Sequence, residues 1–172
     1  MTFAAQDAAS WLANPRATRE TLEAFGLATK HRLGQNFLVE DNIIRKIIRL
    51  AELTSDDVVL EVGPGLGTLT VAMLDYVRAV CSIEADRELE GVLATTCKEP
   101  HQDSFVLCMG DALKATPQLV GDAYASLGVF ADAQSKEASG ALIGPNKFVS
   151  NLPYQVAATL ILLFFQEFTT LE

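Results

Sequence analysis

Residues of the kind that bind metal ions are scarce in this sequence. It has 2 histidines and 3 cysteines among 172 residues, and His31 and His101 stand far apart. The cysteines at positions 81, 97 and 108 form no C-x-x-C pair. Two of them, Cys81 and Cys108, lie in strand-like runs, as core thiols do. We therefore expect no protein metal site.

Long apolar runs are also missing. The longest one, residues 156–165, is too short to cross a bilayer. No N-terminal stretch combines a basic start, an apolar run and a cleavage site of small residues, so no signal peptide is predicted. With 49% apolar and 20% charged residues, the composition is typical of one globular α/β domain. We expect a cytoplasmic protein that has no membrane partner.

Basic residues are in deficit, and the net charge is −9. Residues 1–50 carry seven Lys and Arg against five Asp and Glu, whereas residues 51–172 carry six against seventeen. The small basic surplus therefore lies in the N-terminal part. This distribution weakens the case for RNA binding without excluding it.

The N-terminal part is predicted to be helical. Residues 1–29 form a lead-in, in which Asn14 and Pro15 are typical of a helix start and Phe25 and Gly26 of a helix end. Asp41 is predicted to cap a second helix that ends near residue 53. One face of that helix is apolar, with Ile43, Ile44, Ile47 and Ile48, and the other is basic, with Arg45, Lys46 and Arg49. For the basic face, solvent exposure is favoured over contact with RNA.

From residue 58 onward, short apolar strands alternate with helices. The predicted strands are 58–62, 79–83, 105–109 and 147–150, and the predicted helices are 68–76, 87–96 and 155–168. This alternation indicates an α/β fold with a parallel sheet covered on both faces. The Gly-, Ala-, Ser- and Asp-rich stretch 121–145 is predicted to be a long mobile loop.

A glycine loop, E-V-G-P-G-L-G-T at residues 61–68, follows the first predicted strand. Its spacing is G-x-G-x-G and not the G-x-G-x-x-G of dinucleotide sites. Glu61 would repel a pyrophosphate at this position but would attract a cation. S-adenosylmethionine carries a sulfonium and an ammonium group, so the loop predicts binding of this cofactor, with Gly63 and Gly65 close to it.

Carboxylates also follow the next two strands. Glu84 is placed to accept hydrogen bonds from both ribose hydroxyls. Asp111, in G-D-A-L at residues 110–113, is placed to accept one from the adenine amino group, although taken alone it fits a turn cap equally well. Asp86 is predicted to cap the next helix.

The corner N-L-P-Y at residues 151–154 ends the fourth predicted strand, where an open parallel sheet binds its ligands. An adenine amine is a poor nucleophile because its lone pair is delocalised into the ring. The carbonyls of the Asn151 side chain and the Leu152 backbone could accept its two N–H bonds. Pro153 fixes the corner, and Tyr154 offers a stacking face worth about 1–3 kcal/mol in comparable contacts. The corner therefore predicts an adenine site that works by positioning and electrostatics.

Five motifs, in order, resemble the ribosomal RNA adenine N6-dimethyltransferase family, and in particular its bacterial small-subunit members. They are L-G-Q-N-F-L at 33–38, E-V-G-P-G-L-G-T-L-T at 61–70, I-E-A-D at 83–86, G-D-A-L at 110–113 and N-L-P-Y at 151–154. The resemblance implies a class I, Rossmann-like fold. It also implies S-adenosylmethionine-dependent dimethylation of two adjacent adenines in the 3′-terminal hairpin loop of small-subunit (16S) rRNA, in an immature ribosomal subunit during ribosome biogenesis.

The resemblance further implies a role for each matching residue. The target amine would lie against Asn151, Leu152, Pro153 and Tyr154. The cofactor would lie against Gln35, Asn36, Leu38, Glu61, Gly63, Gly65, Glu84, Asp111, Ala112 and Asn151.

The family continues beyond the point where this chain stops, with further strands and a small helical domain. We therefore expect an incomplete methyltransferase domain over residues 30–172, without the C-terminal helical domain. The fourth strand is then expected at a sheet edge, with part of helix 155–168 exposed. Cofactor binding is expected to persist in such a fragment, whereas activity on RNA is expected to suffer.

Three other functions fit part of the sequence. One is a resistance-type methyltransferase that acts on large-subunit rRNA. The full L-G-Q-N-F-L motif and Tyr154 favour the small-subunit enzyme over this alternative. Another is a non-catalytic module that docks on an immature ribosomal subunit. The third, a small-molecule methyltransferase, would fit the acidic charge but leaves the corner at residues 151–154 unexplained.

Overall fold

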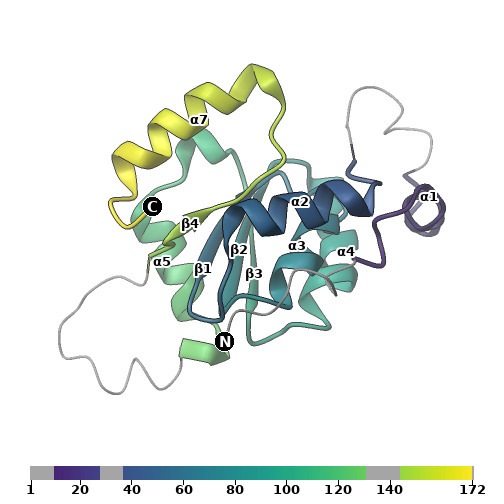
Figure 1. The fold of residues 1–172 in the computed structure, drawn as a ribbon, viewed down its shortest axis with the longest axis horizontal. Coiled ribbons are helices and arrows are strands. Elements are labelled where there is room, and N and C mark those ends of the chain that lie inside the picture. The colour runs from purple at the N-terminus through teal and green to yellow at the C-terminus, as the bar shows by residue number, and fades with distance from the viewer. Residues whose placement is uncertain (1–9, 28–36, 131–143, 172) are drawn as a thin grey trace.

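The computed structural model describes residues 10–27, 37–130 and 144–171. Figure 1 shows a central sheet with helices packed around it. Its four parallel strands are β1 (Val58–Val62), β2 (Ala79–Glu84), β3 (Phe105–Met109) and β4 (Lys147–Phe148), in the order β3-β2-β1-β4. The predicted parallel α/β sheet is confirmed. The strand order reverses between β1 and β4, which is where sheets of this type bind their ligands.

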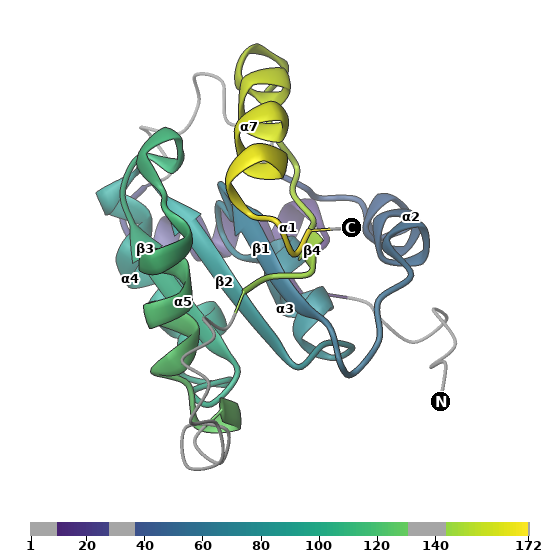
Figure 2. The same ribbon diagram turned by 90° about the vertical axis from the view of Figure 1, so that its left-hand side faces the viewer.

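The side chains of successive strand residues point alternately to the two faces of the sheet and pack into two hydrophobic cores, one on each face. Val59 and Val80 face helices α2 (Asp41–Ala51), α3 (Thr68–Leu74) and α4 (Glu90–Leu93). Leu60 and Cys81 face helices α5 (Pro117–Ala125) and α7 (Tyr154–Glu167). In Figure 2, α2 and α5 lie on opposite sides of the strands. Both faces are covered, as the apolar strand sequences predict.

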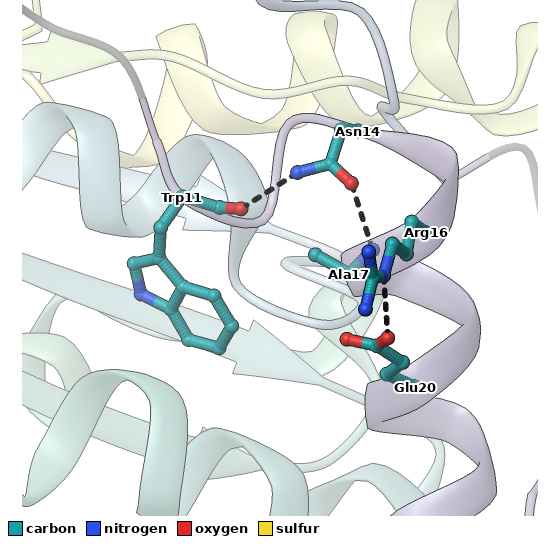
Figure 3. A network of polar contacts seen from close by, with 5 residues as sticks. All are labelled: Trp11, Asn14, Arg16, Ala17 and Glu20. Carbon is teal, nitrogen blue, oxygen red and sulfur yellow. Dashed lines mark hydrogen bonds and ion pairs between the residues drawn. The ribbon is translucent and has the colours of Figure 1, made fainter.

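Helix α1 (Pro15–Ala24) begins and ends as its sequence predicts. The Asn14 side chain accepts a hydrogen bond from the backbone N–H of Ala17 at 2.8 Å, and Pro15 is the first helical residue. Gly26 follows the helix with φ 69°, a conformation that glycine adopts without strain. Figure 3 shows the cap, in which Asn14 also donates to the carbonyl of Trp11 at 3.1 Å.

Helix α2 differs from its prediction at both ends. Glu40, and not Asp41, holds the N-cap position, and it forms no side-chain cap bond. Asp41 is the first helical residue and pairs with Arg45, one turn later, at 2.6 Å. An aspartate in the first turn is stabilised by the helix dipole, so it need not cap. The helix ends at Ala51 because Glu52 turns left-handed, with φ 49°.

The isoleucines of α2 are divided between the core and the surface. Ile44 and Ile48 are fully buried, whereas Ile43 is 42% exposed. The predicted four-isoleucine face is therefore wrong for Ile43. The exposed Lys46 and Arg49 lie outside the core, as predicted.

The helix predicted at 87–96 is divided into three short pieces. A 3₁₀ turn, η1 (Arg87–Leu89), leads into α4, and a π-type turn, η2 (Ala94–Lys98), follows. Asp86 caps η1 by accepting from the backbone N–H of Glu88 at 2.9 Å, as predicted.

The loop predicted at 121–145 is wrong over its first ten residues. Helix α5 runs to Ala125, and a 3₁₀ turn, η4 (Gly128–Phe130), follows. Thr116 accepts a hydrogen bond from Leu119 N at 3.2 Å, and Pro117 occupies the first turn, so α5 begins with the same kind of cap as α1. The buried Tyr124 hydroxyl donates to the carbonyl of Val59 at 2.6 Å. Residues 131–143 lie outside the described part of the chain.

Strand β4 is shorter than predicted because a side chain takes over its pairing with β1. The Ser150 hydroxyl accepts from the backbone N–H of Val62 and donates to the carbonyl of Val62, both at 2.7 Å. Among the described residues, β4 pairs with β1 alone and so forms an edge of the sheet.

Helix α7 is partly exposed, as expected. Leu160 and Phe164 are buried against the sheet, while Leu162 is 66% exposed. Within the described ranges, we find no helix with the length and apolar character needed to span a membrane.

Replacing Tyr124 by Phe should lower the free energy of unfolding by about 1–2 kcal/mol. The substitution removes one buried hydrogen bond while keeping the ring in the core. Urea unfolding measures the loss. Tyr154→Phe, at a side chain that is 97% exposed, is the control and should leave stability unchanged. Equal stability of both variants would contradict the structural role of the Tyr124 hydroxyl.

Replacing Gly67 by Ala should destabilise the protein more than replacing Gly63 by Ala. Both glycines have positive φ, 89° and 66°, so each alanine carries strain of about 1–2 kcal/mol. At Gly67 the new methyl group would also collide with the Cys97 thiol, which should cost about 1–3 kcal/mol more. At Gly63 nothing lies within 4 Å. Unfolding midpoints that agree for the two variants would refute the predicted collision.

Candidate functional site

A cavity of about 790 Å³ lies at the carboxyl ends of β1, β2 and β4. Its walls come from five places: the segment before α2, the end of β1 with the glycine loop, the start of α3, the end of β2, and the corner that leads into α7. The lining residues are Phe37, Leu38, Glu61, Gly63, Pro64, Gly65, Thr68, Leu69, Glu84, Ser150, Asn151, Leu152, Pro153, Tyr154, Gln155, Ala157 and Ile161. Most of the predicted site is therefore brought together around one hollow.

The glycine loop forms the floor of this cavity. Gly63 and Gly65 have φ of 66° and 62°, and Gly63 N–H donates to the Ile83 carbonyl at 2.9 Å. The ring of Phe37 packs directly on Gly65, since a Cβ atom there would lie 3.2 Å from it. Because these glycines have no side chains, other groups can approach the loop backbone closely, as Phe37 does at Gly65.

Glu61 is a buried carboxylate in the cavity wall. Its side chain is 1% exposed, and its Oε2 accepts hydrogen bonds from the Thr70 hydroxyl at 2.7 Å and the Ser82 hydroxyl at 2.6 Å. Burial raises the pKa of Glu61 to about 7, while the two hydrogen bonds act to lower it and the nearby Glu84 adds to the rise. The carboxyl group of Glu61 is therefore ionised in only a fraction of the protein molecules near neutral pH.

Glu84 connects the end of β2 to the glycine loop. Its Oε1 accepts from the backbone N–H of Asp86 at 2.9 Å, and its Oε2 lies 3.4 Å from the backbone N of Gly65. Burial raises the pKa of Glu84, against the lowering effect of these bonds. A carboxylate has about four lone-pair sites, so it can still accept bonds from a ligand. Its predicted contact with ribose hydroxyls stays a prediction.

The electrostatics of the cavity favour a cation. Among the described lining residues, two are carboxylates, Glu61 and Glu84, and none is Lys, Arg or His. The negative potential of these two buried carboxylates would repel phosphate groups and attract an ammonium or a sulfonium. The described residues contain no group of three or more His, Cys, Asp or Glu side chains that could hold a metal ion.

The corner at residues 151–154 forms the rim of the cavity. Pro153 precedes α7 with extended backbone angles, and its carbonyl accepts from Val156 N and Ala157 N at 3.1 Å. Tyr154, the first residue of α7, is 97% exposed. The corner therefore presents an aromatic side chain to solvent beside the hollow, while the predicted stacking of Tyr154 on a base stays a prediction.

Asp111 and Ala112 do not line the cavity. Asp111 accepts from Leu113 N at 3.0 Å and so caps the turn after β3, which is the alternative that its sequence left open. Ala112 is buried against the core on the α5 side of the sheet. Their predicted contact with the cofactor's adenine stays a prediction. Gln35 and Asn36 lie outside the described residues.

Several residues that shape the site received no role from the sequence, and Phe37, Ser150 and Thr68 are three of them. Phe37 lies within the L-G-Q-N-F-L motif but was given no role. Ser150 stands immediately before the N-L-P-Y corner, and its hydroxyl ties that corner to β1. Thr68, at the start of α3, also lines the cavity. Each of them lies within or beside one of the five motifs, which was the only hint in the sequence of a role at the site. Which group each side chain contacts is visible only in the folded structure.

Comparison with known proteins identifies a family whose model matches most of this chain. The family model for ribosomal RNA adenine dimethylase matches residues 26–171. The chain is 40% identical over 143 residues to ribosomal RNA small subunit methyltransferase A of Opitutus terrae, covering 83% of this chain and 45% of that protein. It is also 40% identical over 158 residues to the protein of that name from Natranaerobius thermophilus, covering 91% and 50%.

A solved structure extends the comparison to the fold. The 23S rRNA methyltransferase ErmE is similar to this chain with a TM-score of 0.59 and 27% identity, over 80% of this chain and 45% of that one. The chain thus spans about half the length of the relatives that it matches. With a parallel sheet, a glycine loop and an N-L-P-Y corner around one cavity, and with the family model matching most of its length, the chain belongs to the ribosomal RNA adenine dimethylase family.

Proposed function

We propose that this chain forms the cofactor-binding part of an S-adenosylmethionine-dependent rRNA adenine N6-dimethyltransferase. Its proposed targets are two adjacent adenines in the 3′-terminal hairpin loop of small-subunit rRNA, methylated in the cytoplasm during ribosome biogenesis. The observation that carries this proposal is one cavity that joins two carboxylates, Glu61 and Glu84, to a rim with Asn151 and Tyr154. Family membership supports adenine as the target, and the name of the curated relatives supports the small subunit.

The charge of the cavity and the open backbone of its glycine loop support the proposed cofactor. S-adenosylmethionine supplies an electrophilic methyl group on a positively charged sulfur. In this chain the two wall carboxylates favour the cationic end, and Gly63 and Gly65 allow close approach of the backbone. Glu84 offers acceptor sites for ribose hydroxyls. Leu38 supplies an apolar wall, and Gln35, Asn36, Asp111 and Ala112 are proposed to complete the contacts.

The rim suits the base that receives the methyl group. The side-chain carbonyl of Asn151 and the backbone carbonyl of Leu152 are proposed to accept the two N–H bonds of the target amine. This arrangement favours a pyramidal nitrogen, whose lone pair is then available for bonding. Tyr154 is proposed to stack on the flipped base, and its exposure leaves the ring face accessible.

No strong general base is required at this rim. The proton of an adenine amine becomes acidic only once the nitrogen is alkylated, and solvent can then take it. The chain's contribution is therefore positioning and electrostatic preorganisation rather than proton abstraction.

Methylation of large-subunit rRNA is the second candidate function. The likeness to the 23S rRNA methyltransferase ErmE favours it, because the two share the fold at 27% identity. Small-subunit relatives match at 40% identity, which is the reason for preferring the small subunit.

Calorimetric titration with S-adenosylmethionine should show binding in the range of about 1 µM to 1 mM, which is typical of enzyme substrates. Glu84→Ala should weaken the binding at least about tenfold, because it removes a wall carboxylate. Glu90→Ala is the matched control, since Glu90 is exposed in α4 and lies outside the cavity wall. Circular dichroism checks that each variant is folded. A folded chain that binds no cofactor would argue against the proposal.

Replacing Asn151 by Ala should lower methyl transfer to small-subunit rRNA by about 10²–10³-fold while weakening cofactor binding far less. The loss is that expected for a positioned polar group at a reacting centre. Transfer of a radiolabelled methyl group to purified small-subunit and large-subunit rRNA measures it. An unchanged rate would contradict the catalytic role of Asn151. Absence of any transfer by the wild-type chain would favour a non-catalytic docking module. Labelling of large-subunit rRNA alone would favour the second candidate.

A further inference from the structure

The carboxylate of Glu61 is held by a pair of hydroxyl groups that do not themselves line the cavity. The Thr70 hydroxyl reaches it from α3, and the Ser82 hydroxyl from the position beside Glu61 on β2. Both donate to the same oxygen, Oε2, and both side chains are fully buried. Two donors from two different elements fix the plane of the carboxylate.

The other oxygen of Glu61 faces the cavity. Oε1 receives no hydrogen bond from the described residues, and it is not among their buried polar atoms that lack a partner, which are Ser10 Oγ and Asp41 Oδ1. Since Glu61 lines the cavity, Oε1 is open to it. The pair of hydroxyls thus leaves a single acceptor directed at a ligand.

This arrangement determines where a proton can sit on Glu61. Because Oε2 already accepts two hydrogen bonds, a proton that neutralises the carboxyl group is carried by Oε1. Oε1 then presents an O–H donor to the cavity, where a cationic ligand also presents donors. A cation therefore binds more weakly when Glu61 is protonated than when it is charged.

The other titratable groups that face Glu61 supply no positive charge that would keep its carboxyl group ionised. They are Glu84 on β2, which adds negative charge, and Cys97 in η2, whose pKa is raised to about 12 mainly by burial, so that it stays a neutral thiol. The nearby parts of α3 and of the corner after β4 contribute only uncharged side chains to the wall, among them Thr68 and Ser150. The described lining contains no basic side chain.

We propose that Thr70 and Ser82 are positioning residues that make Glu61 a proton-linked acceptor for the cationic end of the methyl donor, so that binding of the donor releases a proton from Glu61 to solvent. This inference rests on the proposed function, since it assumes that the ligand is S-adenosylmethionine. The proton balance is simple: the neutral carboxyl group loses one proton, which enters solvent, and the resulting carboxylate pairs with the incoming cation.

The linkage has a definite sign. Burial raises the pKa of Glu61 to about 7 in the free protein, so the carboxyl group is largely neutral below that pH and charged above it. The affinity for S-adenosylmethionine should fall by up to about tenfold per pH unit below this pKa and level off above it. Near pH 7, about half a proton should be released for each molecule bound.

Titrations with adenosine and with variants distinguish proton-linked binding at Glu61 from a purely structural role of Thr70 and Ser82. Adenosine carries no cationic end, so its affinity should not change between pH 6 and pH 8.5. Ser82→Ala and Thr70→Val each remove a bond that lowers the pKa of Glu61, so the bend in the profile should move to higher pH. Each should lose about tenfold in affinity at pH 6.5 for each unit by which that pKa rises, and much less at pH 8.5.

Two further variants complete the set. Glu61→Gln, which cannot ionise, should bind S-adenosylmethionine with the low affinity of the acidic limit at every pH. Thr18→Val removes a hydroxyl from another buried threonine, in α1 and away from the cavity, and should keep the wild-type profile.

The experiment is isothermal titration calorimetry of the whole chain from pH 6 to pH 8.5, in buffers of different ionisation enthalpy, which count the protons released. A profile that bends near pH 7 in the wild type, and at higher pH in Ser82→Ala or Thr70→Val, supports the inference. A flat wild-type profile, or one that the two variants leave unmoved, overturns it while the proposed function stands. No binding of S-adenosylmethionine by the folded wild type at any pH would overturn both.

Discussion

Strand β1 is held on both sides at its carboxyl end by side chains, in addition to the hydrogen bonds of the sheet. Glu61 bonds to Ser82 on β2, and the Ser150 hydroxyl after β4 bonds to both backbone groups of Val62. Glu84 then links the end of β2 back to the glycine loop that follows β1. These bonds bring three strand ends together at the point where the strand order reverses. The cavity, the glycine loop and the rim at residues 151–154 all depend on that junction.

The junction carries a cost that the rest of the fold must offset. A carboxylate as deeply buried as Glu61 is expensive to ionise, and its raised pKa expresses this. The glycine loop adds three residues with positive φ, which only glycine adopts without strain. Two hydrophobic cores, one on each face of the sheet, provide the compensating burial. In the described part of the chain, the buried carboxylates Glu61 and Glu84 both lie at the cavity, where a ligand can use them.

Much of the site could be predicted because its parts are encoded locally. The glycine loop follows an apolar strand, and the carboxylates follow the strand ends, so the parallel alternation alone brings Glu61 and Glu84 to one edge. Helix α5 was missed because its Gly and Ala content suggested a loop, although Thr116 and Pro117 form a helix start. Tyr124 stabilises that helix through a contact with β1, and no local pattern reveals a partner 65 residues away.

The sequence by itself determined the fold class, the order of the strands along the chain, and the family, because periodicity, glycine spacing and short motifs depend on neighbouring residues. Only the tertiary structure decided which carboxylates line the cavity and which groups donate hydrogen bonds to them. It placed Asp111 in a turn cap outside the cavity and gave Glu61 two hydroxyl partners from separate elements. It also ended β4 early by a side-chain bond. Hydrogen-bond partners and burial depend on contacts between distant segments, and these exist only when the chain is folded.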